Sequence, residues 1–386
     1  MKHRICTLSI LVWMCVLLGA CQEEMESRSF ISKFRLLGIQ SNPAEAAAGD
    51  YVEVRGIFAP VEGQSASVAW VLMDTQQIAA LDDMLPDDID QYTDEQLAAW
   101  LASIMSEDTD GSVQNAMLSE PAYRVIVSPV DALSGIAVLP SQHVEISSSL
   151  VLLMRAFGQA EGVPLYMLAC SNGEIDEAAL QRIISNLSDT QELGELESAC
   201  VGEESAAIAA YKTLNLYIPA ASEYDALSTP NQNPVVDTFQ IDEISHAQGT
   251  EPGETGSVLC EGKEGCRDPV TFRVSLTKSS YEYYQGYDRR RNEMEKTFVS
   301  WFSNGGEFAG SRIRSNDAQF AVNAMEDGDE ARLDARLADE NESHWFEVEW
   351  MPPVEGGVFD LWIVANDLRG GVGHARYLIR ADAPNY

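Results

Sequence analysis

The sequence predicts a mainly β fold with two tandem β-sandwich domains, the first of which carries α-helical insertions. Three observations lead to this prediction. Short segments of alternating apolar and polar residues recur along the chain, separated by turns rich in Gly, Pro and Asn. A stretch rich in Ser, Pro and Asn divides the 386 residues into two parts. Each part has a Trp inside a predicted strand, Trp70 and Trp301, and an Asn-Pro pair near its start.

The first domain is predicted to span residues 33–218. Its strand 51–58 alternates strictly, with Val52, Val54 and Gly56 on one face. Trp70 lies in the predicted strand 67–73, where it resembles the core Trp on the third strand of an immunoglobulin-like sandwich. Further strands are predicted at residues 34–39, 123–128, 144–146, 149–157, 165–169 and 207–218.

Two insertions in this domain have helical patterns. Thr93 and Gln96 form a capping box at the start of the first helix. Apolar residues then recur at helical spacing, namely Leu97, Trp100, Leu101, Ile104 and Met105. The second helix is predicted at residues 176–187, where one apolar stripe contains Ala179, Leu180, Ile183, Ile184 and Leu187.

Residues 219–234 are predicted to be a linker, because Ser, Thr, Pro and Asn dominate them. The second domain is then predicted to span residues 235–386. A hairpin is expected at its end, where two strands flank a Gly-rich turn that includes Gly370 and Gly371. The predicted strands are residues 239–244, 270–276, 297–302, 344–350, 359–366 and 375–381.

Residues 1–20 have the pattern of an export signal, with basic Lys2 and Arg4, an apolar run, and small residues before Cys21. The run is too short for a membrane span, which needs about 20 residues. Leu18-Gly19-Ala20-Cys21 resembles the bacterial lipobox. The resemblance implies cleavage before Cys21 and acylation of this cysteine with fatty acids such as palmitate. Residues 21–32 would then be a polar tether, and Gln22 after the cysteine favours the outer membrane of a Gram-negative bacterium.

Four cysteines remain in the mature chain: Cys170, Cys200, Cys260 and Cys266. An even number in an exported protein suggests two disulfides, and four cysteines allow three pairings. We favour Cys170–Cys200 and Cys260–Cys266, because each pair then stays within one predicted domain. Zinc is disfavoured, because no CxxC spacing or neighbouring histidine pair is present.

The formal net charge of −36 disfavours nucleic acid as a partner, because phosphate binding requires a basic surface. Acidic residues cluster at 82–90 and at 327–330, which raises the possibility of calcium binding. Neither cluster matches the twelve-residue calcium loop, so the favoured interpretation is solvated acidic loops. No metal and no cofactor is predicted.

A tyrosine- and arginine-rich segment is the candidate ligand-binding surface, with Tyr281, Tyr284, Tyr287, Arg289 and Arg290. Exposed tyrosines can stack on sugar rings, and arginines can pair with acidic groups. The alternative, which we favour, is a strand or strand edge whose arginines balance an acidic protein.

No catalytic motif is present, and the histidines are isolated from one another in the sequence. The layout resembles uncharacterised lipoproteins with immunoglobulin-like domains from Gram-negative bacteria. That resemblance implies a lipid-anchored, non-enzymatic envelope protein for binding or scaffolding. Its partners would be the membrane, through lipid on Cys21, and an envelope protein or polysaccharide. The alternative is an envelope-anchored carbohydrate-active or other hydrolytic enzyme.

Overall fold

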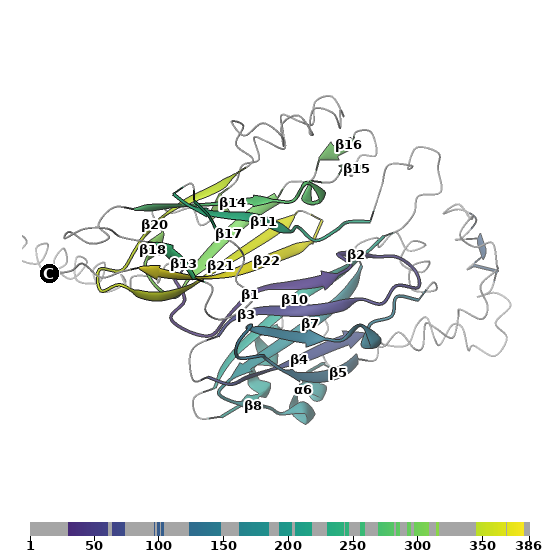
Figure 1. Ribbon diagram of the computed structural model, residues 1–386. Coiled ribbons are helices and arrows are strands. Elements are labelled where there is room, and N and C mark those ends of the chain that lie inside the picture. The colour runs from purple at the N-terminus through teal and green to yellow at the C-terminus, as the bar shows by residue number, and fades with distance from the viewer. Residues whose placement is uncertain are drawn as a thin grey trace, which may run out of the picture.

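The computed structural model of the chain describes residues 30–60, 64–73, 96, 99–100, 102–103, 123–147, 162–184, 193–202, 205–217, 230–242, 244–246, 255–258, 269–281, 283–285, 292–294, 297–308, 314–315, 345–367 and 369–381. Within these residues the chain is mainly β and forms two sandwiches that lie against each other (Figure 1). The four large sheets are each built from strands of one sandwich only. The prediction of a mainly β fold is confirmed.

The N-terminal sandwich pairs a three-stranded sheet with a five-stranded sheet. The strand orders are β1-β3-β6 and β2-β10-β7-β4-β5. The pairing of β2 with β10 is parallel, and the other pairings are antiparallel. The strands are Arg35–Asn42 (β1), Glu45–Ala46 (β2), Glu53–Ala59 (β3), Ala66–Met73 (β4), Tyr123–Pro129 (β5), Ile136–Leu139 (β6), Val163–Ser171 (β7) and Ala206–Leu216 (β10).

Alternation along these strands sends one set of side chains between the two sheets. Val54 and Phe58 of β3 belong to the same buried cluster as Trp70 of β4. Trp70 is fully buried, and its indole N–H donates to Ser128 Oγ at 2.8 Å. A buried indole is stable in a core when its N–H has such an acceptor. The prediction that Trp70 occupies the core of its sandwich is confirmed.

One predicted strand of this sandwich is wrong. Residues 144–146 do not form a strand: Glu145 makes an isolated bridge to Tyr51, after a short 3-10 helix, η3 (Ser141–His143). The strand at this edge is β6, which the sequence reasoning missed. Ala137 and Leu139 of β6 point into the core, although this four-residue strand is too short to give a clear alternation.

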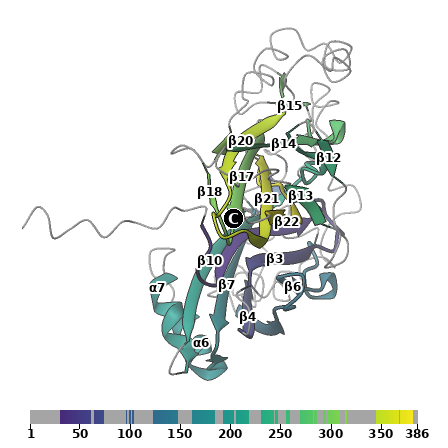
Figure 2. The same cartoon turned by 60° about the vertical axis from the view of Figure 1, so that its left-hand side comes forward.

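The second helical insertion lies against the outer face of the five-stranded sheet (Figure 2). The disulfide Cys170–Cys200 closes it at its base, with the two Cα atoms 5.7 Å apart, as predicted. Leu180 and Ile184 are buried against this face of β4 and β7, so β7 is buried on both sides. Asp176 caps the helix by accepting from the Ala179 N–H at 2.9 Å. The elements are Glu174–Ile175 (β8), Glu177–Ile184 (α6), Leu193–Leu196 (α7), Glu197–Ala199 (η5) and Cys200–Val201 (β9).

Several predicted elements lie partly or wholly outside the described residues. Of the first insertion, residues 96, 99–100 and 102–103 are described and are helical. The predicted strand at 149–157 and the second cysteine pair, Cys260 and Cys266, lie outside the described part of the chain.

The C-terminal sandwich has two five-stranded sheets, with the orders β12-β11-β14-β20-β18 and β13-β22-β21-β17-β19. Among the described strands of this sandwich, β13 and β22 are the one pair that runs in parallel. A separate pair is formed by β15 (Tyr283–Gln285) and β16 (Asn292–Met294), and a 3-10 turn, η7, spans Lys278–Ser280. The strands are Val236–Ile241 (β11), Ile244–His246 (β12), Thr255–Val258 (β13), Val270–Leu276 (β14), Thr297–Ser303 (β17), Glu307–Phe308 (β18), Arg314–Ser315 (β19), Phe346–Met351 (β20), Gly357–Asp367 (β21) and Val372–Ala381 (β22).

The core of this sandwich is aromatic. Trp301 and Trp350 are buried with Phe272, whose ring centroid lies 5.2 Å from that of Trp350. The Trp350 indole donates to the Gly305 carbonyl at 3.0 Å. Trp301 is fully buried on β17, so the predicted strand Trp of the second domain is also a core residue.

One sheet of each sandwich has the same strand order, β2-β10-β7-β4-β5 in the first and β13-β22-β21-β17-β19 in the second. In both sheets an early strand pairs in parallel with the last strand of its sandwich (β2 with β10, β13 with β22). The strand that carries the buried Trp pairs with the next-to-last strand of that sheet in both (β4 with β7, β17 with β21).

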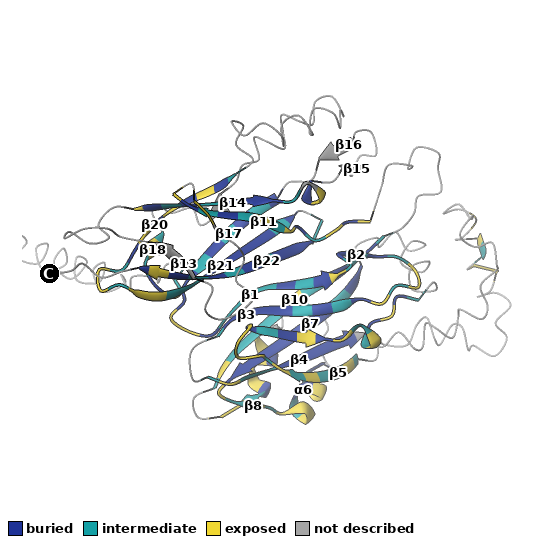
Figure 3. Cartoon of the chain, viewed as in Figure 1, coloured by how far each residue is buried: buried dark blue, intermediate teal, exposed yellow. Residues whose placement is uncertain are grey.

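Strands β3 and β21 contain runs of consecutive buried residues, so side chains on both of their faces are buried (Figure 3). On β3, Ile57 and Ala59 point away from the N-terminal core and are still 1% and 0% exposed. On β21, Trp362 and Val364 point away from the C-terminal core and are 2% and 0% exposed. These side chains are buried because each sandwich covers part of the outer face of the other.

We predict that Trp70→Ala lowers the free energy of unfolding by about 3–5 kcal/mol, because truncation leaves a cavity in a close-packed core. Chemical denaturation followed by circular dichroism measures the change. Leu133→Ala is the control, since Leu133 is 72% exposed and should change stability by less than about 0.5 kcal/mol. Equal effects of the two substitutions would contradict the placement of Trp70.

Candidate functional site

The candidate site is the junction between the two sandwiches. Its apolar part is formed by the outer face of β1 and β3 on one side and that of β17 and β21–β22 on the other. Ile57 packs with Val364 and Val372, and Ala59 packs with Trp362. Gly38 lets β1 approach closely, because a Cβ atom there would lie 3.3 Å from Val372 Cγ1. The contact is therefore a packed core between two sheets.

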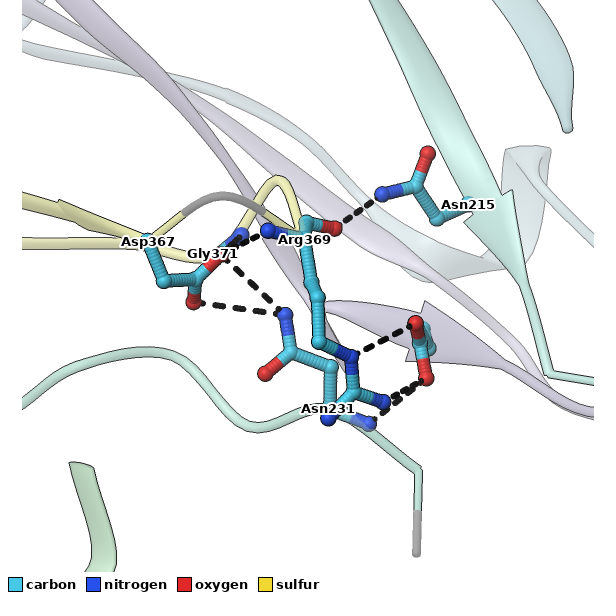
Figure 4. A network of polar contacts seen from close by, with 6 residues as sticks. Asn215, Asn231, Asp367, Arg369 and Gly371 are labelled. Carbon is cyan, nitrogen blue, oxygen red and sulfur yellow. Dashed lines mark hydrogen bonds and ion pairs between the residues drawn. The ribbon is translucent and has the colours of Figure 1, made fainter. Parts of the chain in front are cut away.

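The polar part of the junction is centred on an ion pair between Arg369 and Glu45 (Figure 4). Arg369 lies in the turn between β21 and β22, and Glu45 begins β2 of the other sandwich. Their closest atoms, Nη2 and Oε2, are 2.5 Å apart, and the side chains are only 12% and 15% exposed. Glu45 Oε2 also accepts from the backbone N–H of Asn231 at 2.8 Å. The pair is thus largely removed from water. Each buried charge is therefore stabilised mainly by the other.

Asp367 organises the turn that carries Arg369. Its carboxylate accepts from the backbone N–H groups of Arg369 at 2.8 Å and Gly371 at 2.7 Å, and from Asn231 Nδ2 at 3.2 Å (Figure 4). Burial raises the pKa of the Asp367 carboxyl, while these donors and the Arg369 charge act in the opposite direction. A Cβ atom at Gly371 would overlap the Asp367 carboxylate, so the turn requires glycine there.

Strand β10 of the N-terminal sandwich contacts the carbonyl groups of the same turn. Asn215 Nδ2 donates to the Arg369 carbonyl, and Lys212 Nζ donates to the Gly370 carbonyl at 2.8 Å. Burial lowers the pKa of the Lys212 ammonium to about 8, although the charge of Asp367 acts to raise it. The turn is therefore held by β2 and β10 together.

Residues 230–234 fill the space between the two sandwiches, although the sequence indicated a linker. Asn231 is 1% exposed. Asn233 spans the junction, because its Nδ2 donates to the Ser41 carbonyl at 2.6 Å and its Oδ1 accepts from the Val372 N–H at 2.9 Å. A Cβ atom at Gly373 would overlap the Pro234 carbonyl. This end of the predicted linker is a structural part of the junction.

Two further contacts extend the junction. The Arg376 guanidinium of β22 donates to the Leu133 carbonyl and pairs with Asp360 at 2.7 Å. His374, also on β22, is largely buried; burial lowers the pKa of its imidazole, and the nearby charge of Arg55 on β3 adds to this effect. Most of these polar groups have a partner within or across the junction, which suits a role in fixing orientation. Among the described residues, Ser41 Oγ and Asn231 Oδ1 are buried there without a hydrogen-bond partner.

The sequence reasoning missed Glu45, Lys212, Asn231, Asp367 and Arg369 as functional residues. Asp367 and Arg369 lie in a turn that the Gly-rich pattern does predict. The residues that contact this turn, Lys212, Asn231 and Glu45, lie more than a hundred residues away from it in the sequence. No local pattern in the sequence indicates these pairings.

One predicted ligand-binding residue is wrong. Tyr281 is 6% exposed and belongs to the core cluster of the C-terminal sandwich, so its ring is not on the surface. Tyr284 lies in β15, which pairs with β16. Tyr287, Arg289, Arg290 and the lipidation residue Cys21 lie outside the described residues, as do both acidic clusters at 82–90 and 327–330.

Among the residues that the structure describes, no three His, Cys, Asp or Glu side chains lie together as metal ligands. In the same residues, no helix has the length and apolar character needed to cross a membrane.

Comparison with known proteins gives weak structural matches. No protein-family model matches the chain, and no curated protein does. Escherichia coli alpha-2-macroglobulin activated by porcine elastase matches with a TM-score of 0.21 and 8% identity, over 92% of this chain and 22% of that one. A 1.5-MDa bacterial ice-binding adhesin matches with a TM-score of 0.19 and 6% identity, over 92% and 65%. Dimeric latent PorU from Porphyromonas gingivalis matches with a TM-score of 0.20 and 8% identity, over 92% and 24%.

The chain spans less than two thirds of the length of each of these three proteins. Because the TM-scores are near 0.2, the matches support no statement about the fold or the function of this chain.

We predict that Arg369→Ala uncouples the two sandwiches. Glu45 would keep a buried charge without its partner, which costs about 3 kcal/mol. Chemical denaturation should then resolve two transitions, because the sandwiches no longer stabilise each other. The matched control is Arg273→Ala, which removes a more exposed pair with Glu347 inside one sandwich and should cost less than about 1 kcal/mol. A single unchanged transition for Arg369→Ala would show that the ion pair does not couple them.

We also predict that stability rises with pH above 8. The folded pKa of Lys212 is about 8, below its ordinary value of 10.5, so the unfolded chain binds more protons between these values. The free energy of unfolding should increase by up to about 1 kcal/mol per pH unit between pH 8 and pH 9.5. Lys212→Met should remove this increase, and Lys33→Met, at an exposed position, should keep it. The same slope in both variants would exclude Lys212 as its source.

Proposed function

We propose that this chain is a lipid-anchored protein of a bacterial cell envelope that serves as a rigid, non-enzymatic binding or scaffolding module. The observation that carries the proposal is the junction. Arg369, Asp367 and Asn233 connect the two sandwiches through largely buried polar contacts, beside the apolar contacts of Ile57 and Trp362. Two domains joined in this way present their surfaces in a fixed relative orientation, which is what a scaffold requires.

Each sandwich is proposed to be immunoglobulin-like. The strand order shared by one sheet of each half supports this, since a parallel pairing at the edge of that sheet occurs in both halves. The positions of Trp70 on β4 and Trp301 on β17 also support it, because the immunoglobulin fold buries a Trp on its third main strand. The N-terminal domain then differs by its helical insertions, one of which is closed by Cys170–Cys200.

The proposed anchor is the lipidated Cys21. The sequence Leu18-Gly19-Ala20-Cys21 supports it, together with the short apolar run before it. Several acyl chains on one residue give stable attachment, whereas a single chain binds only marginally. Since the chain is strongly acidic, the lipid supplies the attachment and electrostatic attraction to anionic lipid does not. Gln22 after the cysteine favours the outer membrane.

The proposed partners are an envelope protein or a polysaccharide. A rigid pair of sandwiches offers sheet faces and loop ends at fixed spacing. A partner that contacts both domains would therefore bind more tightly, because less conformational entropy is lost on binding. The net charge of −36 favours a neutral or basic partner over nucleic acid.

We predict that the mature protein from the membrane fraction begins at an acylated Cys21. Intact-mass and peptide mass spectrometry should find the diacylglyceryl and N-acyl groups on this residue, and no peptide from residues 1–20. Cys21→Ser is the control and should leave the chain unacylated. A native N-terminus that still carries Met1 would contradict both the anchor and the envelope location.

A further inference from the structure

One end of the C-terminal sandwich, which we call the distal end, lies away from the turn that carries Arg369. The strand register defines it. Strand β20 ends there at Met351, which pairs with Glu307, and β21 begins there at Gly357, which pairs with Ala381. The β11–β12 turn lies at the same end, because Ile241 pairs with Phe272 close to the pair of Val270 with Trp350.

Apolar side chains on the surface of this sandwich concentrate at the distal end. Val354 is 65% exposed, Ile244 is 66% exposed and Val358 is 59% exposed, and Met351 is also exposed. Val354 lies in the connection between β20 and β21, while Met351 ends β20 and Val358 lies near the start of β21. In the described part of this sandwich, the other large apolar side chain with comparable exposure is Val235, which lies at the junction end. Single exposed apolar residues are common, but a group at one end marks an interaction surface.

The N-terminal segment of the chain joins the fold beside the last residue of β17, which is the end of this strand nearer to the distal end. Phe30 forms a parallel bridge with Ser303, and the Ile31 N–H donates to the Ser303 carbonyl at 2.8 Å. Ser303 is the last residue of β17 and pairs with Leu361 of β21. Gly357 lies four residues further towards the distal end along β21, which is about 13 Å in an extended strand.

The chain between Cys21 and Phe30 is short. Phe30 is nine positions after Cys21, and nine positions span at most about 30 Å when fully extended. Lipid on Cys21 would therefore hold Ser303 within about 30 Å of the bilayer, and Gly357 at the distal end lies about 13 Å further along β21. A sandwich tethered in this way can place its distal loops on the lipid surface.

We propose that the distal end is the membrane-facing end of the molecule, and that Val354, Val358, Met351 and Ile244 contact the bilayer interface. This inference rests on the proposed lipid anchor at Cys21. Glu355 and Glu307 are exposed at the same end, so the surface fits a zwitterionic lipid and not an anionic one. Four small apolar contacts do not anchor a protein by themselves; they orient one that lipid already holds.

The test uses the full lipidated protein in phosphatidylcholine vesicles whose acyl chains carry bromine. An environment-sensitive fluorescent amino acid is placed at position 354, and in a matched protein at position 235, which is also exposed but lies at the junction end. Genetic encoding of the probe leaves the native cysteines unmodified. Vesicle flotation and mass spectrometry of Cys21 accompany the fluorescence measurement.

We predict blue-shifted emission and bromine quenching at position 354, and neither at position 235. Val358→Asp should reduce the quenching at position 354, because a charged side chain resists transfer into the interface. Floated, acylated protein without quenching at position 354, or with equal quenching at both positions, would overturn the orientation alone. A blue shift at position 354 that requires high protein concentration instead of vesicles would identify a second copy as the occupant and also overturn it. An unmodified Cys21 would remove the anchor and this inference together.

Discussion

The arrangement of the two sandwiches depends on the contact between Arg369 and Glu45. Arg369 extends from a hairpin turn of one sandwich to the first residue of β2 in the other, where little water reaches either charge. The pair can hold this position because Asp367 shapes the turn and Asn231 supports the Glu45 carboxylate. A buried ion pair is costly to form and more costly to break on one side only. It therefore specifies one orientation of the domains, while the apolar contacts of Ile57, Val364 and Val372 supply the burial that stabilises it.

Local sequence patterns predicted the features that depend on residues close together in the sequence. Alternation predicts most strands, and a helical apolar stripe predicts α6 next to the disulfide Cys170–Cys200. The features that were missed depend on contacts distant in sequence. Tyr281 looks like a surface tyrosine beside charged residues, yet the fold places it in the core. Asn231 and Asn233 look like linker residues, yet their amides are held by Asp367, Ser41 and Val372 across the junction.

The junction also explains why some strands carry apolar residues on both faces. In an antiparallel sheet with one solvated face, Ile57 and Trp362 would be expected to be polar. Both are buried because each sandwich covers the outer face of the other. The same reasoning applies to β7, whose outer face is covered by α6. An apolar residue out of phase with the core pattern is therefore a sequence signal of a second packing surface, although it does not identify the partner.

The proposed lipid anchor, the packed pair of sandwiches and the net charge of −36 are physically compatible. In this proposal the lipid would hold the chain at the membrane without help from charge, and the acidic side chains would keep the remainder solvated. The junction would then transmit the orientation set near the membrane to the N-terminal sandwich, which carries the helical insertions. The value of this arrangement to a binding or scaffolding protein lies in presenting its surfaces at a fixed position.

The most direct measurement of the junction is the distance distribution between two spin labels, one in each sandwich, by pulsed electron paramagnetic resonance. Genetically encoded labels at positions 127 and 244, both exposed, leave the native cysteines unchanged. A junction that fixes the domains predicts a single narrow distribution, which broadens when Glu45 is replaced by Ala. A broad or multimodal distribution in the unmodified protein would contradict a rigid pair of sandwiches.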